Sequence, residues 1–241
     1  MVTAIAYWRP STTAEALEIL ARPGAVVLAG GTRLNADPSH APVEVVDLQD
    51  LHLDGVVHET GDLLRVGAML TLQQLADHPD VPAVVREAAR RERPSTLRAQ
   101  GTVGGCVATG SGESELLAAL LVHEAVVLVD SGHGREAVAL GTFLAGLPLG
   151  GDRVVAAVSF RTAGTAAAAR TARTPADTAI VAAVGRVADG VRRVAVTGVG
   201  PRPVLVQPGD ELHPAGDFRG SSEYRRALVD VLVARVVEEV S

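Results

Sequence analysis

The chain has 241 residues, which suits one large domain or two small ones, and 47% of them are hydrophobic and 21% charged, as in a folded globular protein. A formal net charge of −6, with no lysine in the sequence, excludes the clustered positive charge that nucleic-acid or anionic-membrane binding requires. The single cysteine excludes an internal disulfide, and it excludes a thiolate zinc or iron-sulfur site built by this chain alone.

The start of the chain lacks the basic and apolar segments of a secretory signal. The longest apolar passage, at 116–129, is interrupted by His123 and Glu124 and is shorter than the roughly 20 residues that a membrane-spanning helix needs. We therefore expect a cytoplasmic protein that contacts neither a membrane nor nucleic acid, with homo-oligomerisation left open.

Hydrophobic periodicity and turn residues predict a mixture of helices and strands. The first part of the chain is predicted to form a helix from Thr12 or Thr13 to about 23, strands at 25–29 and 43–48, and a hairpin of 55–58 and 63–67. Helices at 71–78 and 81–92, a polar loop at 94–112 and a helix at 115–123 follow. The rest is predicted to form strands at 125–130, 138–143, 154–160 and 191–198 and a last helix at 222–239. The stretch 161–174, rich in Ala, Thr and Arg, has little period and is predicted to be a linker. It divides the chain into domains at 1–160 and 165–241.

Two predicted helices carry side chains that cluster. The helix at 81–92 brings together four arginines, and we interpret them as a solvated helix face: Arg86, Arg90, Arg91 and Arg93. The last helix is predicted to bury one apolar face, made of Tyr224, Leu228, Val231, Leu232 and Val236.

Two segments place a glycine pair beside a strand or a helix, namely 28–34 and 101–106. Glycine lets the backbone come close to a ligand, and successive free amides in such a turn suit a phosphate oxygen. Four hydroxyls nearby could add donors: Thr32, Thr102, Thr109 and Ser111. Two facing loops would suit a pyrophosphate. Neither segment fits the nucleotide-binding motif G-x-G-x-x-G or the Walker pattern. Both can therefore also be interpreted as ordinary tight turns at the ends of strands.

Motifs along the whole chain resemble those of the FAD-binding medium subunit of the molybdenum hydroxylases, the family of the carbon monoxide dehydrogenase and xanthine dehydrogenase flavin modules. Ala29-Gly-Gly-Thr-Arg-Leu34 resembles its first flavin loop, A-G-G-T-x-L, and Arg98-Ala-Gln-Gly-Thr-Val-Gly-Gly105 resembles its second, R-N-x-G-T-I-G-G. Further matching segments, in the family's order, are Tyr7–Leu20, Val46–Leu48, Leu64–Ala68 with Thr71 and Leu75, Arg173 with Asp177–Ala179, and Ser222–Arg226.

The resemblance implies an α+β fold of the p-cresol-methylhydroxylase (PCMH) type: two α/β subdomains at about 1–54 and 55–160 that bind FAD, followed by a smaller C-terminal domain of sheet and helix at 165–241. It also implies the cofactor-binding positions, which are Val27, Leu28, Ala29, Gly30, Gly31, Thr32, Arg33, Leu34, Thr102, Val103, Gly104, Gly105, Cys106, Glu115, Arg170 and Asp177. Glu115 aligns with a family carboxylate suited to ribose hydroxyls, although a Glu that complements a helix dipole explains it equally well.

The sequence departs from the family at several positions near the expected flavin. The family's Asn after the second glycine pair is Cys106, its proline in P-x-x-D is Gly112, and its C-terminal aromatic is Thr178. A family lysine aligns with Arg170 or Ala169. No histidine pair has metal-ligand spacing, so no metal site is predicted. The sequence does not identify a catalytic residue.

Three functions therefore stay open. The resemblance implies a flavin subunit of an oxidoreductase that passes electrons from iron-sulfur and molybdenum-cofactor partner subunits to an external acceptor. The altered residues leave room for a stand-alone FAD enzyme that acts on a small organic substrate. They also leave room for a scaffold or binding protein of the same fold that has lost flavin.

Overall fold

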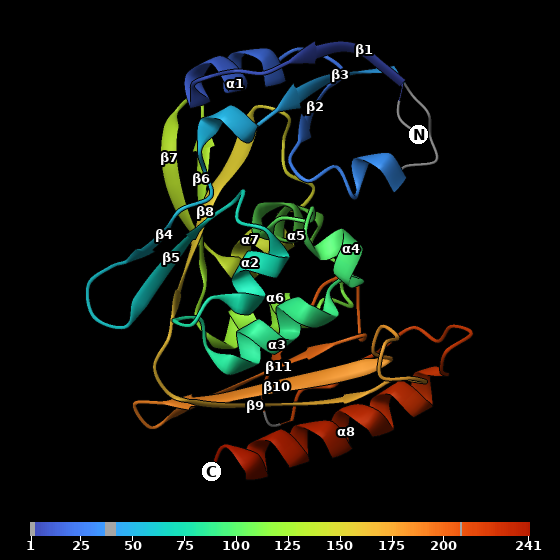
Figure 1. Cartoon of the computed structure of the whole chain (residues 1–241). Coiled ribbons are helices and arrows are strands. Elements are labelled where there is room, and N and C mark those ends of the chain that lie inside the picture. The colour runs from blue at the N-terminus through green and yellow to red at the C-terminus, as the bar shows by residue number, and fades with distance from the viewer. Residues whose placement is uncertain (1–2, 37–41, 208) are drawn as a thin grey trace.

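Three β-sheets organise the computed structural model of the chain, which describes residues 3–36, 42–207 and 209–241. Figure 1 shows a small N-terminal sheet at the top, a longer sheet and a group of helices in the middle, and a C-terminal sheet backed by one long helix at the bottom. This mixture of helix and strand confirms the predicted α+β class.

The N-terminal sheet is parallel and has the order β1-β3-β2. Its strands are β1 (Thr3–Trp8), β2 (Ala25–Leu28) and β3 (Pro42–Asp47), and helix α1 (Thr13–Leu20) joins the first two. Thr12 caps α1 as predicted, because its hydroxyl accepts a hydrogen bond of 3.2 Å from the Glu15 amide. Ala16, Leu20 and Val46 form a small apolar core beside this sheet.

The five-stranded sheet is antiparallel and has the order β4-β5-β8-β6-β7. Its strands are β4 (Val56–His58), β5 (Leu63–Gly67), β6 (Val126–Ser131), β7 (Gly134–Ala139) and β8 (Arg153–Arg161). The β4–β5 hairpin confirms the prediction for 55–67. The predicted strand at 138–143 is wrong, since 140–145 forms helix α7 (Leu140–Ala145), which buries Leu140, Phe143 and Leu144 at helical spacing.

Helices fill the space between this sheet and the C-terminal sheet (Figure 1). They are α2 (Leu72–Asp77), α3 (Ala83–Arg91), α4 (Ser95–Arg98), α5 (Val103–Thr109) and α6 (Glu115–Val122), with short 3-10 turns η1 (Leu34–Ala36) and η2 (Gln49–Leu51) before them. Every residue of α6 is buried, so this helix forms the centre of the main core. The predicted loop at 94–112 is wrong, because it contains α4 and α5.

The C-terminal sheet is antiparallel, with the order β12-β11-β10-β9. Its elements are β9 (Thr165–Thr171), β10 (Val181–Ala188), β11 (Val191–Thr197) and β12 (Val204–Val206), and α8 (Ser222–Glu239) covers it. The predicted linker at 161–174 is wrong, since β9 pairs with β10 through seven residues. The run of alanines carries no strand periodicity, and the strand forms because β10 and α8 pack against it.

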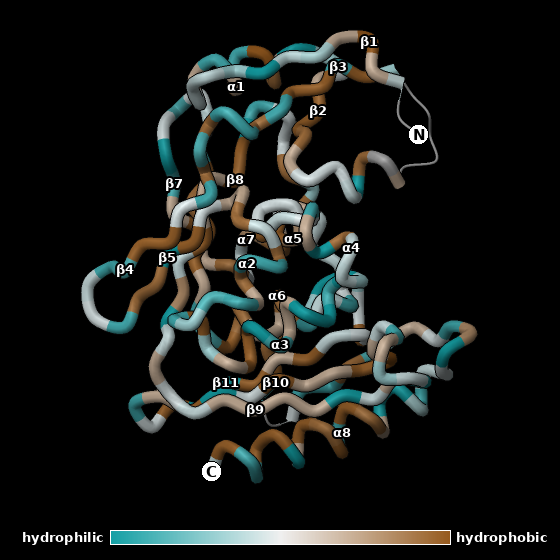
Figure 2. Tube along the Cα trace, in the orientation of Figure 1, coloured by the Kyte–Doolittle hydropathy of each residue, from teal (hydrophilic) through white to brown (hydrophobic). Residues whose placement is uncertain are grey.

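The buried face of α8 differs from the predicted one. Arg225, Val229, Leu232 and Val236 are buried, whereas Val231 is 64% exposed and Tyr224 is 45% exposed. Apolar and polar residues alternate closely along α8, as Figure 2 shows, so the sequence pattern did not define a single stripe. Only the packing of the helix on the sheet selects the face.

The main core extends across the predicted domain boundary. Val184 of β10 and Ala195 of β11 belong to the same buried cluster as α6 and the five-stranded sheet. The C-terminal sheet is thus packed directly on the central helices. The division into domains at 1–160 and 165–241 stays a prediction.

Candidate functional site

A cavity of about 550 Å³ lies where the chain leaves β2 and where α5 begins. It brings together the two glycine segments that the sequence analysis singled out. Its lining consists of Val27, Ala29, Gly30, Gly31, Thr32, Arg33, Leu34, Leu72, Glu92, Arg93, Gly101, Thr102, Gly105, Cys106, Ala108, Thr109, Ser111, Leu147, Pro148 and Arg202. This volume is in the range of small-molecule and cofactor sites.

The first glycine segment turns sharply after β2 and lies against the second. Gly31 has a φ of +70°, a conformation that favours glycine. A Cβ on Gly30 would lie 1.8 Å from the Gln100 carbonyl oxygen, so only glycine allows the two segments to meet. Within the described residues, no backbone or side-chain acceptor is bonded to the amides of 30–33. These amides are available to an anionic ligand.

The second glycine segment is the first turn of α5 rather than an open loop. Thr102 caps this helix, and its hydroxyl accepts a 3.1 Å hydrogen bond from the Gly105 amide. The Val103 amide donates to Leu70 O at 2.9 Å, and the Gly104 amide donates to Ala68 O at 2.8 Å. The expectation that this segment offers a nest of free amides is therefore wrong. The helix start instead contributes a wall to the cavity.

Ten of the sixteen predicted cofactor-binding residues line the cavity: Val27, Ala29, Gly30, Gly31, Thr32, Arg33, Leu34, Thr102, Gly105 and Cys106. Leu28, Val103 and Gly104 lie in the same segments without lining it. Gly104 has a packing role, because a Cβ there would lie 2.6 Å from the Ala68 Cβ. A larger side chain at Gly104 would therefore disturb the core as well as the cavity.

Glu115 and Arg170 lie together but outside the cavity. Glu115 is buried and accepts a 2.9 Å hydrogen bond from Arg170 Nε, and Arg91 Nη1 lies 3.4 Å from its other oxygen. Arg170 also donates to the carbonyl oxygen of Asp177 at 2.5 Å. Both oxygens of Glu115 thus face arginines, and Glu115 does not line the larger cavity.

Asp177 lines a second cavity, of about 290 Å³, beside the C-terminal sheet. Thr178 and Phe218 line it as well, and the Phe218 side chain is 87% exposed. Arg173 and Arg219 lie over the Phe218 ring, with guanidinium carbons 5.9 and 5.8 Å from its centroid. The sixteen predicted residues therefore fall into two places rather than one.

Sequence reasoning missed Glu92, which follows the last turn of α3 and lines the larger cavity. Its Oε1 accepts hydrogen bonds from Ser114 Oγ at 2.6 Å and from the Leu116 amide at 3.0 Å. Burial raises the pKa of this carboxyl above its ordinary value. The available signal was an acidic residue inside an arginine-rich stretch, Arg90-Arg-Glu-Arg93. Arg93 from that stretch is exposed and lines the same cavity.

Cys106 contacts this carboxyl through its thiol, with a Sγ to Glu92 Oε2 distance of 3.5 Å. Burial, and then the charge of Glu92, raise the pKa of the Cys106 thiol well above its ordinary value. The thiol is consequently neutral at physiological pH and is not an activated nucleophile.

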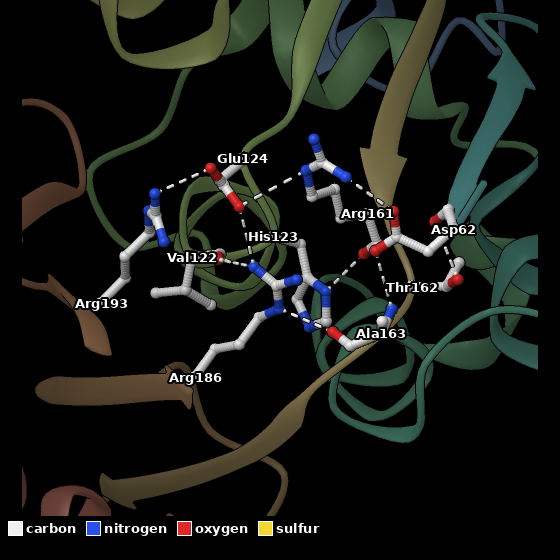
Figure 3. Close-up of polar contacts among 9 residues, drawn as sticks. All are labelled: Asp62, Val122, His123, Glu124, Arg161, Thr162, Ala163, Arg186 and Arg193. Carbon is white, nitrogen blue, oxygen red and sulfur yellow. Dashed lines mark hydrogen bonds and ion pairs between the residues drawn. The ribbon is translucent and has the colours of Figure 1, made fainter. Parts of the chain in front are cut away.

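A second polar cluster, which shares no residue with the lining of the larger cavity, lies where α6 ends against the C-terminal sheet (Figure 3). Arg186 is 1% exposed and donates to Val122 O at 3.1 Å, to Ala163 O at 2.9 Å and to Glu124 Oε2 at 3.1 Å. Arg193 lies 2.8 Å from the other oxygen of Glu124. These contacts join the end of α6 to the C-terminal sheet, while Arg186 Nη2 and His123 Nε2 are buried without a partner among the described residues.

Two classes of site are not found in residues 3–36, 42–207 and 209–241. No three His, Cys, Asp or Glu side chains group closely enough there to hold a metal ion. No helix in these ranges is long and apolar enough to cross a membrane.

Residues 3–160 match the family model described as the FAD binding domain in molybdopterin dehydrogenase. The chain belongs to this family. It is 32% identical over 248 residues to the uncharacterized protein YgfM of Escherichia coli K12, covering 95% of this chain and 93% of YgfM. It is 29% identical over 280 residues to the nicotine 6-hydroxylase medium subunit of Paenarthrobacter nicotinovorans, covering 98% and 97% of the two chains.

The fold is also that of a solved structure. Carbon monoxide dehydrogenase from Hydrogenophaga pseudoflava aligns with a TM-score of 0.87 and 23% identity, over 100% of this chain and 98% of that chain. The predicted family and fold are confirmed by these matches. FAD is the cofactor that the family model names, and this too agrees with the prediction.

The residues of the larger cavity fit FAD. The amides of 30–33 and the guanidinium groups of Arg33 and Arg93 would hold a diphosphate, because they combine free donors with positive charge. The Thr102, Thr109 and Ser111 side chains supply hydroxyls along the same lining.

Proposed function

We propose that this chain is the flavin subunit of a molybdenum hydroxylase and passes electrons from iron-sulfur and molybdenum-cofactor partner subunits to an external acceptor. Membership of the family and a relative named as a medium subunit support this proposal. A cytoplasmic location is part of it. Bound FAD supplies the redox chemistry, and the protein supplies binding and orientation.

The observation that carries the proposal is that the amides of 30–33, on the wall of a cofactor-sized cavity, have no acceptor among the residues that the structure describes. Backbone amides without protein acceptors are costly unless solvent or a ligand satisfies them. Arg33 places a positive charge beside them, and the positive φ of Gly31 holds the turn that presents them. This segment would bind the diphosphate, while the start of α5 would form the opposite wall.

Flavin binding is tested by the absorption spectrum of the purified chain before and after FAD addition and desalting, followed by titration with FAD. Gly31→Val should lower the affinity for FAD by about a hundredfold or more, since each hydrogen bond to a charged group contributes about 1.5–3 kcal/mol and the turn presents several. Gly190→Val is the matched control. Gly190 has a φ of +73° with nothing near its Cβ position, in the turn between β10 and β11.

Both variants carry the same strain at positive φ, and only one alters the cavity. Equal FAD affinity in the two variants, or a wild-type chain that ignores FAD, would contradict the proposed binding site. Electron transfer is tested on the complex isolated from the cells that make it, by metal analysis and by anaerobic reduction of its flavin. Recovery of the flavin-loaded chain without iron or molybdenum would favour a stand-alone flavoenzyme instead.

A further inference from the structure

Glu92 is the carboxyl group that lines the larger cavity, and it is rigidly held there. One of its oxygens accepts two hydrogen bonds, from Ser114 Oγ and from the Leu116 amide. Ser114 is also the residue that caps α6, and Leu116 lies in the first turn of that helix. The carboxyl is therefore anchored to the most deeply buried helix of the protein.

The second oxygen of Glu92, Oε2, accepts no strong hydrogen bond from the described residues. Its contact is with the Cys106 thiol at 3.5 Å, which is a weak donor. A carboxylate oxygen has two lone-pair directions, so Oε2 can accept at least one strong hydrogen bond more. Within the described residues, Glu92 forms no ion pair, in contrast to Glu115, which contacts Arg91 and Arg170.

The charge of Glu92 restricts what can lie beside it. A phosphate would be repelled by a carboxylate in a partly buried cavity, so the diphosphate belongs at the amides of 30–33 and at Arg33. A ligand group next to Glu92 must instead carry no negative charge and must donate a hydrogen bond. In FAD, the groups that adjoin the diphosphate and meet both conditions are the hydroxyls of the ribityl chain and of the adenosine ribose.

We propose that Glu92 accepts a hydrogen bond from a sugar hydroxyl adjoining the FAD diphosphate, and that it thereby positions the cofactor. This assignment rests on the proposed function. It gives to Glu92 the role that the family resemblance assigned to Glu115, whose two oxygens both face arginines. Glu92 is a positioning and specificity residue, because a site that pairs with a hydroxyl discriminates against ligands that lack it.

The test compares the dissociation constants of FAD, ADP and FMN for the wild-type chain and for Glu92→Gln. The amide oxygen of Gln can still accept from Ser114 and Leu116, while the second acceptor oxygen is replaced by a donor. The affinity for FAD should fall about tenfold, as expected for the loss of one hydrogen bond to a charged group. A matching loss for ADP alone would place the ribose at Glu92, and a loss for FMN alone would place the ribityl chain there.

Glu87→Gln is the matched control, because Glu87 lies on α3, the helix that Glu92 follows, and pairs with Arg91 at the surface. It should leave all three constants unchanged. Glu115→Gln tests the position that the resemblance favoured. Unchanged constants in Glu92→Gln, or the tenfold loss in Glu115→Gln instead, would overturn the assignment while leaving the proposed function intact. A wild-type chain that does not bind FAD would overturn both.

Discussion

The larger cavity and the charged cluster of Figure 3 both concentrate polar groups, but they differ in what those groups bond. In the cluster, Arg186, Glu124 and Arg161 are paired with one another or with backbone carbonyls. In the cavity, the amides of 30–33 have no acceptor among the described residues, and one oxygen of Glu92 can accept a further hydrogen bond. Mutual pairing of charges therefore marks a structural joint, even though Arg186 Nη2 and His123 Nε2 are buried there without a partner among the described residues. Unused donors and acceptors on the wall of a cavity mark a place for a ligand.

The largest effect is expected for the charged cluster, where replacing Arg186 should lower the free energy of unfolding. Arg186→Leu leaves the Val122 and Ala163 carbonyls and one Glu124 oxygen without this donor in a buried setting. Breaking a buried ion pair by removing one partner costs about 3–5 kcal/mol, and we expect a loss of that size in the free energy of unfolding. Urea denaturation measures it.

Arg193→Leu is the control, since Arg193 contacts the same Glu124 but its side chain is 28% exposed. Its loss should be at most about 1 kcal/mol. Equal losses in the two variants would show that the cluster is no tighter than an ordinary surface pair. A selective loss of FAD affinity in Arg186→Leu, at unchanged stability, would show that the cluster belongs to the cofactor site.

A smaller effect is expected from pH, through His123 in the same cluster. His123 is 1% exposed, and burial lowers the pKa of its ring from 6.5 to about 4. Its Nδ1 lies 2.7 Å from Arg161 O, and its Nε2 is buried with no partner in the described chain. The neutral ring thus donates through Nδ1 and has no place for a second proton.

The sign follows from linkage. Above pH 6.5 the ring is neutral in both the folded and the unfolded chain, so its full contribution is present. As the pH falls from 6.5 towards 4, His123 becomes protonated in the unfolded chain but stays neutral in the folded chain. The free energy of unfolding therefore falls by about 3 kcal/mol over this range. Urea denaturation at several pH values should show a shallower pH dependence in His123→Gln. Parallel curves for variant and wild type would refute this reading.

The smallest effect concerns Cys106 on the cavity side. Because burial raises the pKa of its thiol, alkylation by iodoacetamide at pH 8 should be slower than that of glutathione, and FAD should slow it further. Mass spectrometry of the labelled chain follows the reaction. Faster alkylation than glutathione would mean that the thiol faces solvent as an activated group, and indifference to FAD would place the cofactor elsewhere.

Elements with local signals could be predicted from the sequence. The predicted helix starts at Thr12 and Thr71 agree with the structure, where these residues cap α1 and α2. Thr71 forms a capping box with Gln74. The strand-like segments 55–58 and 63–67 predicted the β4–β5 hairpin, which the structure contains. The alanine-rich β9 and the boundary between β7 and α7 could not be predicted, because partners distant in the sequence decide them.

The same contrast holds for the candidate site. The first glycine segment was found because its motif and its turn are local. Glu92 was missed because it matches no motif, and its place in the cavity depends on contacts with Ser114 and Leu116 more than twenty positions away. Glu115 aligned with the carboxylate of the family motif, yet arginines from two other elements pair with both of its oxygens.

The position of α6 limits how this protein can be divided or recombined. All eight of its residues are buried, and it packs against β10 and β11 as well as against α3. A fragment that ends at residue 160, where the family model ends, would expose an apolar helix side to water and would be prone to self-association. Exchange of the C-terminal part between relatives would succeed only if the α6-facing surface of β10 and β11 were exchanged with a matching helix.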